Sequence, residues 1–318
     1  MGILKRGRLF FRKRGFVATV KQTADKCVRQ LKKTPNACKE RLVRKKHIKL
    51  LREVTVGKEV YIVIPCNDWA LPLFQRPHQI SKNLSSMENS VVLFISDQAR
   101  YDNFCFTKKV TQSIYLFSLR MVSTLDKILA DSKQVTVVMY WTRHYNLLSK
   151  FQYDKLVYEY VDELQLLPYY DEKMEITHRE LLENADLTLA TADELYKKAV
   201  PFAKKLILSP NAADYELFST QRDCAINPMI SELVKEYSCV LGYYGAFAFW
   251  FDYDLVLETA RRNKDWLFIL IGYDYDGTVS CIHKASLSNV LFIESRPYSE
   301  LPSFVRGFDI QVIPFVIN

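Results

Sequence analysis

The sequence predicts an α/β protein with two Rossmann-like units in succession, preceded by a basic helical arm. From residue 58 onward, short apolar runs of strand character alternate with helical patterns, and the alternation restarts after a less patterned stretch at 215–237. A length of 318 residues also fits two domains of about 150 residues each. We therefore expect an arm at 1–54, a first unit at 55–218, and a linker with a partial second unit at 219–318.

The arm carries most of the positive charge. Residues 1–52 hold 18 Lys/Arg and 2 Asp/Glu, whereas the other 266 residues hold 26 and 34. Apolar residues recur at helical spacing between 16 and 31, and Thr34-Pro35 then starts a second basic helix. We favour an anchor on an anionic membrane surface through residues 1–52, slightly ahead of packing on the body. Nucleic acid is the least favoured partner, because few aromatic side chains interrupt the charges.

The composition excludes several classes of protein. Charged residues make up 25% and hydrophobic ones 49% of the chain, which excludes general disorder. The longest apolar run has nine residues, at 243–251, too short for a membrane helix, and neither GxGxxG nor a P-loop motif occurs. Seven scattered cysteines without a CxxC motif indicate reduced thiols. We expect a cytoplasmic protein held at the inner face of the cell membrane.

The elements follow in order along the chain, because β-rich apolar runs indicate buried parallel strands and the amphipathic runs between them indicate covering helices. In the first unit we expect strands at 59–65, 90–96, 134–141, 155–161, 185–191 and 204–210, and helices at 77–87, 123–131, 178–184 and 192–202. In the second we expect about four strands, at 239–245, 266–272, 289–294 and 309–315, and helices at 253–262 and 299–306.

The loop after the first strand is the first candidate site, since ligands of such sheets bind beyond the carboxyl ends of the strands. It carries Asp68, Trp69, Arg76 and His78, and a cation at a helix N-terminus suits an anionic or hydroxyl-rich ligand. The alternative is structural: Asp68 caps a turn, Trp69 is core and His78 shapes the loop. Spacing alone favours that alternative.

The run W-x5-QRPHQI resembles the first-helix motif of bacterial group 1 glycosyltransferases with the GT-B fold, including those of teichuronic acid synthesis. Further segments are similar in the same order, with Ala212-Ala213 in place of the family's Gly-Val. These segments are 156–168, 183–199, 209–218, 241–255, 267–277 and 289–315. The resemblance spans about 58–318, which is everything but the arm.

The resemblance implies transfer of a sugar from a nucleotide-sugar to a hydroxyl of a cell-surface glycan or lipid-linked acceptor, between two Rossmann-like domains. The first domain would bind the acceptor and the second the nucleotide. Gly242 and Gly245 correspond to a loop beside the donor phosphates, where missing Cβ atoms let backbone N–H groups approach an anion. Arg296 and Tyr298 correspond to a loop beside the base, although packing is the simpler role for Tyr298.

Transfer requires a group that takes the acceptor's proton. Asp68, His78 and Asp162 are the catalytic candidates, with Arg143 and His144 secondary, and the acceptor-binding candidates are Trp69, Arg76, Glu163 and Arg143. Two Asp-x-Asp triplets, at 252–254 and 274–276, invite a metal interpretation, but we expect no metal and no cofactor beyond the nucleotide-diphosphate sugar that serves as substrate.

A non-catalytic glycosyltransferase-like binding or scaffold subunit is the alternative function. In the family, the last strand is followed by a segment whose lysine and glutamates hold the donor, and this sequence ends at Asn318. We therefore expect the second unit to be incomplete, either as a fragment or as one that a partner chain completes. On that expectation, the chain alone binds nucleotide-sugar weakly and turns over little.

Overall fold

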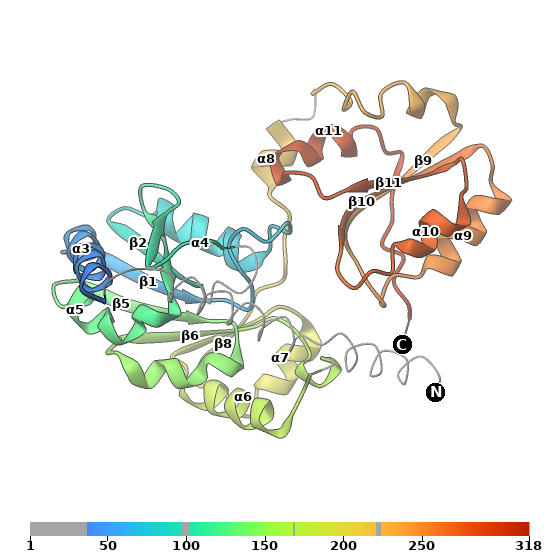
Figure 1. Cartoon of the computed structure of the whole chain (residues 1–318). Coiled ribbons are helices and arrows are strands. Elements are labelled where there is room, and N and C mark those ends of the chain that lie inside the picture. The colour runs from blue at the N-terminus through green and yellow to red at the C-terminus, as the bar shows by residue number, and fades with distance from the viewer. Residues whose placement is uncertain (1–36, 97–101, 168, 221–223, 318) are drawn as a thin grey trace. The chain divides into compact units, whose positions relative to one another are not determined.

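The computed structural model describes residues 37–96, 102–167, 169–220 and 224–317. The chain divides into two compact units (Figure 1). The first comprises Met1–Leu71 and Gln75–Asn211, and the second Pro72–Phe74 and Ala212–Asn318. Residue 218, where we expected the boundary, lies within helix α8 (Tyr215–Thr220) of the second unit.

The first unit is built on one large sheet with the strand order β3-β4-β2-β1-β5-β6-β7-β8. All described neighbours pair in parallel except β3, which runs antiparallel to β4. The six expected strands are confirmed, and β3 and β4 are additions. The bounds are β1 Glu59–Ile64, β2 Ser90–Ser96, β3 Thr107–Lys109, β4 Ile114–Ser118, β5 Gln134–Met139, β6 Lys155–Tyr160, β7 Leu187–Ala190 and β8 Leu206–Leu208.

Helices cover this sheet, and the four expected helical regions are confirmed with shifted bounds. The helix expected at 178–184 begins six residues earlier, because the Asp171 side chain caps its first turn by accepting from the backbone N of Met174, 2.9 Å away. The bounds are α3 Ala37–Thr55, α4 Arg76–Ser86, α5 Leu125–Leu129, α6 Glu172–Asn184 and α7 Asp193–Ala199, with 3-10 segments at Leu119–Thr124, Thr142–Lys150 and Leu164–Leu166.

Helix α3 is the second basic helix that was predicted within the arm, and it packs on the first unit beside α5 (Figure 1). Leu51 is completely buried, and Ile48 and Val54 pack against the same core cluster. The Thr55 hydroxyl donates to the carbonyl of Ile128, 2.9 Å away. For this helix the packing interpretation is therefore correct, and the rest of the arm, residues 1–36, lies outside the described residues.

The second unit holds a four-stranded parallel sheet with the order β11-β10-β9-β12 in its described part. The strand expected at 309–315 is reduced to two residues, because the chain then crosses to the loop after β9: Asp252 N donates to the carbonyl of Pro314, and Val316 N to that of Trp250. The bounds are β9 Cys239–Phe247, β10 Trp266–Asp274, β11 Val290–Glu294, β12 Ile310–Gln311, α9 Tyr253–Arg262, α10 Ser280–Ala285 and α11 Leu301–Val305.

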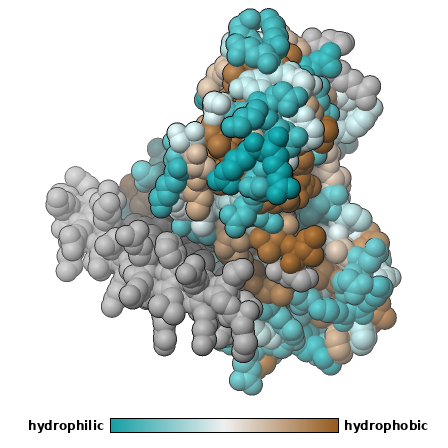
Figure 2. Space-filling model, turned by 90° about the vertical axis from the view of Figure 1, so that its right-hand side faces the viewer, coloured by the Kyte–Doolittle hydropathy of each residue, from teal (hydrophilic) through white to brown (hydrophobic). Residues whose placement is uncertain are grey.

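Each unit has its own hydrophobic core. Two buried clusters belong to the first unit and two others to the second, as expected for a sheet covered by helices on both faces. The face presented in Figure 2 is mostly hydrophilic, with smaller apolar patches between the hydrophilic residues. Among the described helices, none combines the length and apolar character needed to cross a bilayer.

Candidate functional site

The order of the strands in the first sheet reverses between β1 and β5. These two strands are parallel, so their carboxyl ends lie side by side at one edge of the sheet. Ligands of doubly wound sheets bind at such a point. The chain leaving β1, β5 and β6 places Cys66, Tyr140 and Asp162 there. The backbone N of Tyr140 donates to the carbonyl of Ile64, 3.0 Å away, which holds the ends of β1 and β5 together.

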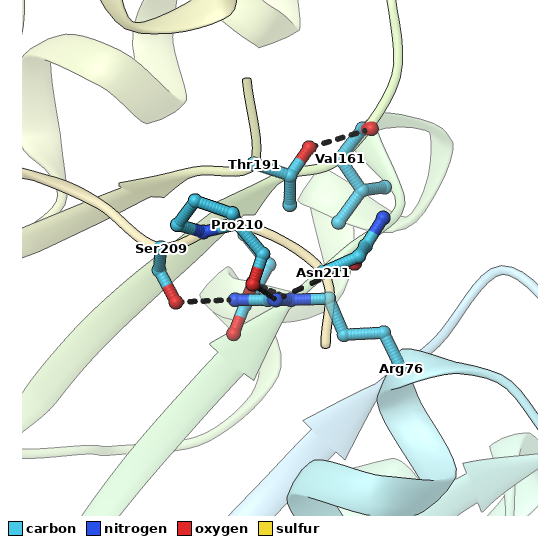
Figure 3. Close-up of polar contacts among 7 residues, drawn as sticks. Arg76, Val161, Thr191, Ser209, Pro210 and Asn211 are labelled. Carbon is cyan, nitrogen blue, oxygen red and sulfur yellow. Dashed lines mark hydrogen bonds and ion pairs between the residues drawn. The ribbon is translucent and has the colours of Figure 1, made fainter. Parts of the chain in front are cut away.

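Arg76 occupies the centre of a polar network beside this edge (Figure 3). Its guanidinium donates from Nε to Glu159, 2.8 Å away, and from Nη2 to the Ser209 hydroxyl, 2.9 Å away. Nη1 faces the carbonyl of Pro210 at 3.4 Å and the side-chain oxygen of Asn211 at 3.5 Å. Arg76, an expected acceptor-binding residue, thus joins the start of α4 to the segment that follows β8.

Glu159, the partner of Arg76, was not singled out by the sequence analysis. Its side chain is only 1% exposed, and that of Arg76 is 14% exposed, so this ion pair is largely withdrawn from water. Burial raises the pKa of the Glu159 carboxyl, and the Arg76 guanidinium opposes that rise. A signal did exist, because Glu159 is a lone charge within the apolar run of β6.

Two weakly acidic side chains lie near this pair: Tyr140, which is buried, and Cys66, which is exposed. Neighbouring protein atoms displace water from the Cys66 thiol and raise its pKa to about 11, and the charge of Asp162 adds to the effect. Burial also raises the pKa of the Tyr140 phenol, with a contribution from Glu159 in the same direction. These groups are therefore protonated and neutral near pH 7, which leaves carboxylates as the negative charges of the edge.

Asp162 is the carboxylate of this edge that remains open to solvent. It follows β6 and is exposed, although neighbouring protein atoms displace enough water from its carboxyl to raise its pKa. A carboxylate with a raised pKa is a stronger base and can still meet a ligand from solution. Among the three catalytic candidates, Asp162 is exposed, whereas Asp68 and His78 are buried.

His78 is placed differently from the expectation. The ring is fully buried at the start of α4, where Nδ1 accepts from the backbone N of Gln75 at 3.1 Å and Nε2 lies 3.1 Å from the carbonyl of Trp69. A carbonyl only accepts, so Nε2 carries the proton. Burial lowers the pKa of the imidazole. The catalytic assignment of His78 is corrected: both nitrogens bind main chain, and the residue shapes the loop.

The loop that carries Asp68 and Trp69 is held by a buried carboxylate. Asp102 is 5% exposed and accepts from the backbone N of Trp69 at 2.8 Å and of Ala70 at 2.9 Å. The Trp69 ring is partly buried and packs edge-on against Phe94, with centroids 5.0 Å apart, at the margin of a core cluster. Asp68 is 8% exposed, and its Oδ1 accepts a hydrogen bond from the Ser96 hydroxyl, 3.4 Å away. The structural alternative for this loop is thus the better description.

The remaining candidates of the first unit form ion pairs. Arg143 donates to the carbonyl of Tyr169 at 2.7 Å and to Asp171 at 3.0 Å, which ties two loops together. Glu163 pairs with Lys198. Burial lowers the pKa of His144, whose Nδ1 is buried without a hydrogen-bond partner in the described structure.

In the second unit, the prediction that Gly242 and Gly245 lie in a loop beside the donor phosphates is wrong. Gly242 and Gly245 both lie inside strand β9. A Cβ at Gly242 would lie 1.9 Å from the Phe308 ring, and one at Gly245 would lie 2.5 Å from the Tyr243 hydroxyl. These glycines therefore allow close packing of side chains, and the loop itself begins at Ala248.

A hollow of about 330 Å³ lies at the carboxyl end of β11. It is lined by Met229 and by residues 291–296, including Glu294, Ser295 and Arg296. Arg296 donates to the Met229 sulfur, while its Nε is buried and has no hydrogen-bond partner among the described residues. An unused N–H beside a hollow suits an oxygen-rich ligand. Tyr298 stacks on Phe74 with centroids 5.4 Å apart, which fits its packing role.

The Asp-x-Asp triplets serve the local fold. Asp252 caps α9 by accepting from the backbone N of Leu255 at 2.8 Å. Asp274 and Asp276 accept from backbone N–H groups of Gly277 and Phe249, at 2.9 and 3.0 Å. Within the described residues, no group of three or more His, Cys, Asp or Glu side chains is arranged to hold a metal ion.

Comparison with known proteins gives one sequence relative. No family model matches the chain. Over 140 residues it is 28% identical to a protein of Bacillus subtilis (strain 168) described as "Putative teichuronic acid biosynthesis glycosyltransferase TuaH". The match covers 42% of this chain and 34% of that protein, so it spans about a third of the relative's length.

Solved structures show the fold. The Anabaena protein Alr3699/HepE, in complex with UDP-glucose, matches with a TM-score of 0.54 and 12% identity over 80% of this chain and 72% of its own. Trehalose-6-phosphate synthase OtsA matches with a TM-score of 0.56 and 10% identity over 80% and 78%. The chain therefore has the fold of the GT-B glycosyltransferases, and over 140 residues its sequence is similar to a bacterial protein described as a glycosyltransferase.

Proposed function

We propose that this chain transfers a sugar from a nucleotide-diphosphate sugar to a hydroxyl of a cell-surface glycan or lipid-linked acceptor. The similarity to TuaH and the GT-B fold support the reaction class. One observation carries the proposal furthest: Asp162, an exposed carboxylate of raised pKa, follows β6, the strand next to β5, at the carboxyl edge of the first sheet.

In this proposal the first unit activates the acceptor. Asp162 takes the proton of the attacking hydroxyl, and its raised pKa increases its proton affinity. Arg76 and Glu159 act as positioning residues, because their buried pair fixes the start of α4 against the segment after β8. Asp68 is mostly buried in the loop that Asp102 holds, so it supports the geometry of the site.

The second unit holds the donor. The hollow after β11 offers the spare Nε–H of Arg296 and the oxygens of Glu294 and Ser295 to a nucleotide. Guanidinium donors pair with carbonyl or phosphate oxygens, and a carboxylate accepts from ribose hydroxyls. A uridine nucleotide is the first probe, because HepE is in complex with UDP-glucose.

The test separates binding from transfer. UDP-glucose and UDP are titrated into the purified chain by calorimetry, and Arg296→Ala should weaken binding about tenfold, the value of one charge-assisted hydrogen bond. Arg306→Ala, an exposed arginine that does not line the hollow, is the matched control. Radiolabelled sugar transfer to a membrane extract is then measured. Asp162→Asn should lower it about a hundredfold or more with unchanged nucleotide affinity.

The outcomes distinguish the two functions. Donor binding without transfer to any extract would favour the non-catalytic binding subunit. No binding of any nucleotide-sugar would refute both. Transfer that survives Asp162→Asn would keep the reaction but move the base to another group.

A further inference from the structure

The outer face of α3 combines cations with apolar side chains. Leu42, Lys45, Lys46, Lys49 and Leu50 recur at steps of three and four residues and thus share one face of the helix. Leu42 is 61% and Leu50 46% exposed, and the three lysines are exposed as well. Apolar and cationic side chains thus lie together on one exposed face, a combination typical of helices that bind at a membrane interface.

The opposite face of α3 holds the helix rigidly on the first unit. Leu51 is completely buried, and the His47 Nδ1 lies 2.6 Å from the Thr107 hydroxyl of β3. Arg52 donates from both Nε and Nη2 to Asp131, at 2.9 and 2.7 Å. The outer face therefore belongs to a preformed surface of the folded unit.

Neighbouring elements extend the positive charge. The 19 residues of α3 include seven Lys/Arg and two Glu. Arg44 reaches the carbonyl of Arg120, which is itself exposed, and Lys108 and Lys109 on β3 are exposed next to Thr107. Glu53 lies 3.9 Å from Lys49, in a pair that is too exposed to neutralise the face.

We propose that this surface, formed by the outer face of α3 with Lys108, Lys109 and Arg120, docks on a bilayer of anionic phospholipid. The lysines would meet the headgroups, and Leu42, Val43 and Leu50 would enter the boundary with the acyl chains. Clustered Lys/Arg gain about 1 kcal/mol each near such a surface, and exposed leucines add burial that a purely polar partner cannot offer. The proposal is independent of the proposed reaction.

Charge and composition favour this partner over others. A second copy of the chain would bring the same positive charge to the contact, so self-association is opposed. A nucleic acid would satisfy the lysines but leave Leu42 and Leu50 exposed, and the stripe offers no aromatic ring for base stacking. An anionic bilayer matches both the cationic and the apolar part of the face.

Vesicle co-sedimentation of the full chain tests the proposal. Binding to vesicles of phosphatidylcholine with phosphatidylglycerol should exceed binding to phosphatidylcholine alone, and it should fall with added salt. Lys45→Gln/Lys46→Gln/Lys49→Gln should reduce the partition coefficient at least about tenfold. Leu42→Ser/Leu50→Ser should reduce it several-fold. Lys150→Gln/Lys173→Gln/Lys205→Gln, at three exposed lysines of the same unit, is the matched control with equal change of charge.

A local readout keeps the test decisive even if other basic residues contribute binding. In Leu50→Trp, lipids with brominated acyl chains should quench the additional fluorescence that this variant has over the wild-type chain. The proposal is overturned if that added signal is not quenched, or if the lysine variant and the control lose binding equally. Tight binding to duplex DNA without vesicle binding would replace lipid by nucleic acid and would also overturn it.

Discussion

The buried pair of Arg76 and Glu159 makes a sharp prediction about stability. Arg76→Leu leaves the Glu159 carboxyl, 1% exposed, without its cation. Such a change costs about 3 kcal/mol or more in free energy of unfolding, because an unpaired charge remains buried. The loss should appear in urea denaturation followed by far-UV circular dichroism. It should be smaller at pH 5 than at pH 8, because burial has already raised the pKa of Glu159 and protonation relieves the isolated charge.

The double variant Arg76→Leu/Glu159→Leu is the control for this pair. It removes both charges and should recover most of the lost stability, since apolar replacement of a buried pair is often neutral. A double variant as unstable as the sum of the two single ones would show that the pair is not coupled.

His178 makes the first unit sensitive to acid. The ring lies 8% exposed between α6 and β6, with Nδ1 2.7 Å from the Tyr158 hydroxyl, and burial lowers its pKa to about 4. Between pH 6.5 and 4 the unfolded chain binds the proton that the folded one excludes, so stability falls as the pH drops through this range. The loss from pH 7 to pH 5 should be about 2 kcal/mol. In His178→Gln, urea midpoints at the two pH values should differ by correspondingly less.

At the scale of single residues, the sequence could indicate which residues lie at the carboxyl edge of the first sheet better than it could predict what each side chain contacts. The QRPHQI run led to Arg76, and the strand at 155–161 led to Asp162. His78 was misassigned because one spacing fits both a general base and a ring that binds the main chain on both sides. Glu159 and Asp102 were missed because their partners are 83 and 32 to 33 residues away, and local spacing carries no record of such contacts.

At the scale of elements, strand β9 gives the clearest test. A Cβ at Gly242 would meet the Phe308 ring at 1.9 Å, so Gly242→Ala must displace that ring or the strand. Overpacking of this kind costs about 1–3 kcal/mol. Adding Phe308→Leu should lower the cost of the alanine, and a double-mutant cycle by urea denaturation measures the coupling. Gly57→Ala is the comparison: nothing lies within 4 Å, and its φ of +65° predicts only a backbone penalty of about 1 kcal/mol.

The elements that periodicity predicted are those with a long buried face. Helix α9 has the expected bounds, 253–262, because its apolar residues recur at helical spacing and Asp252 caps it. Strand β3, at Thr107–Lys109, was not recognised, since a three-residue partly exposed edge strand has no apolar pattern to detect. Helix α10 was missed for a similar reason, with Ile282 as its one buried residue. Apolar periodicity arises where an element buries one face, so short exposed elements such as these have too few buried residues to produce a pattern.

At the scale of the whole molecule, the separate cores predict separate unfolding. The clusters of the first unit and those of the second share no residue, so each unit can lose its packing without dissolving the other's core. Hydrogen exchange measured by mass spectrometry in increasing urea should therefore report two sets of midpoints, one for peptides of β1–β8 and one for peptides of β9–β12. Arg76→Leu should lower only the first set, and Gly242→Ala only the second. A single transition that both variants shift together would contradict independent unfolding and would show that the stability of each unit depends on the other.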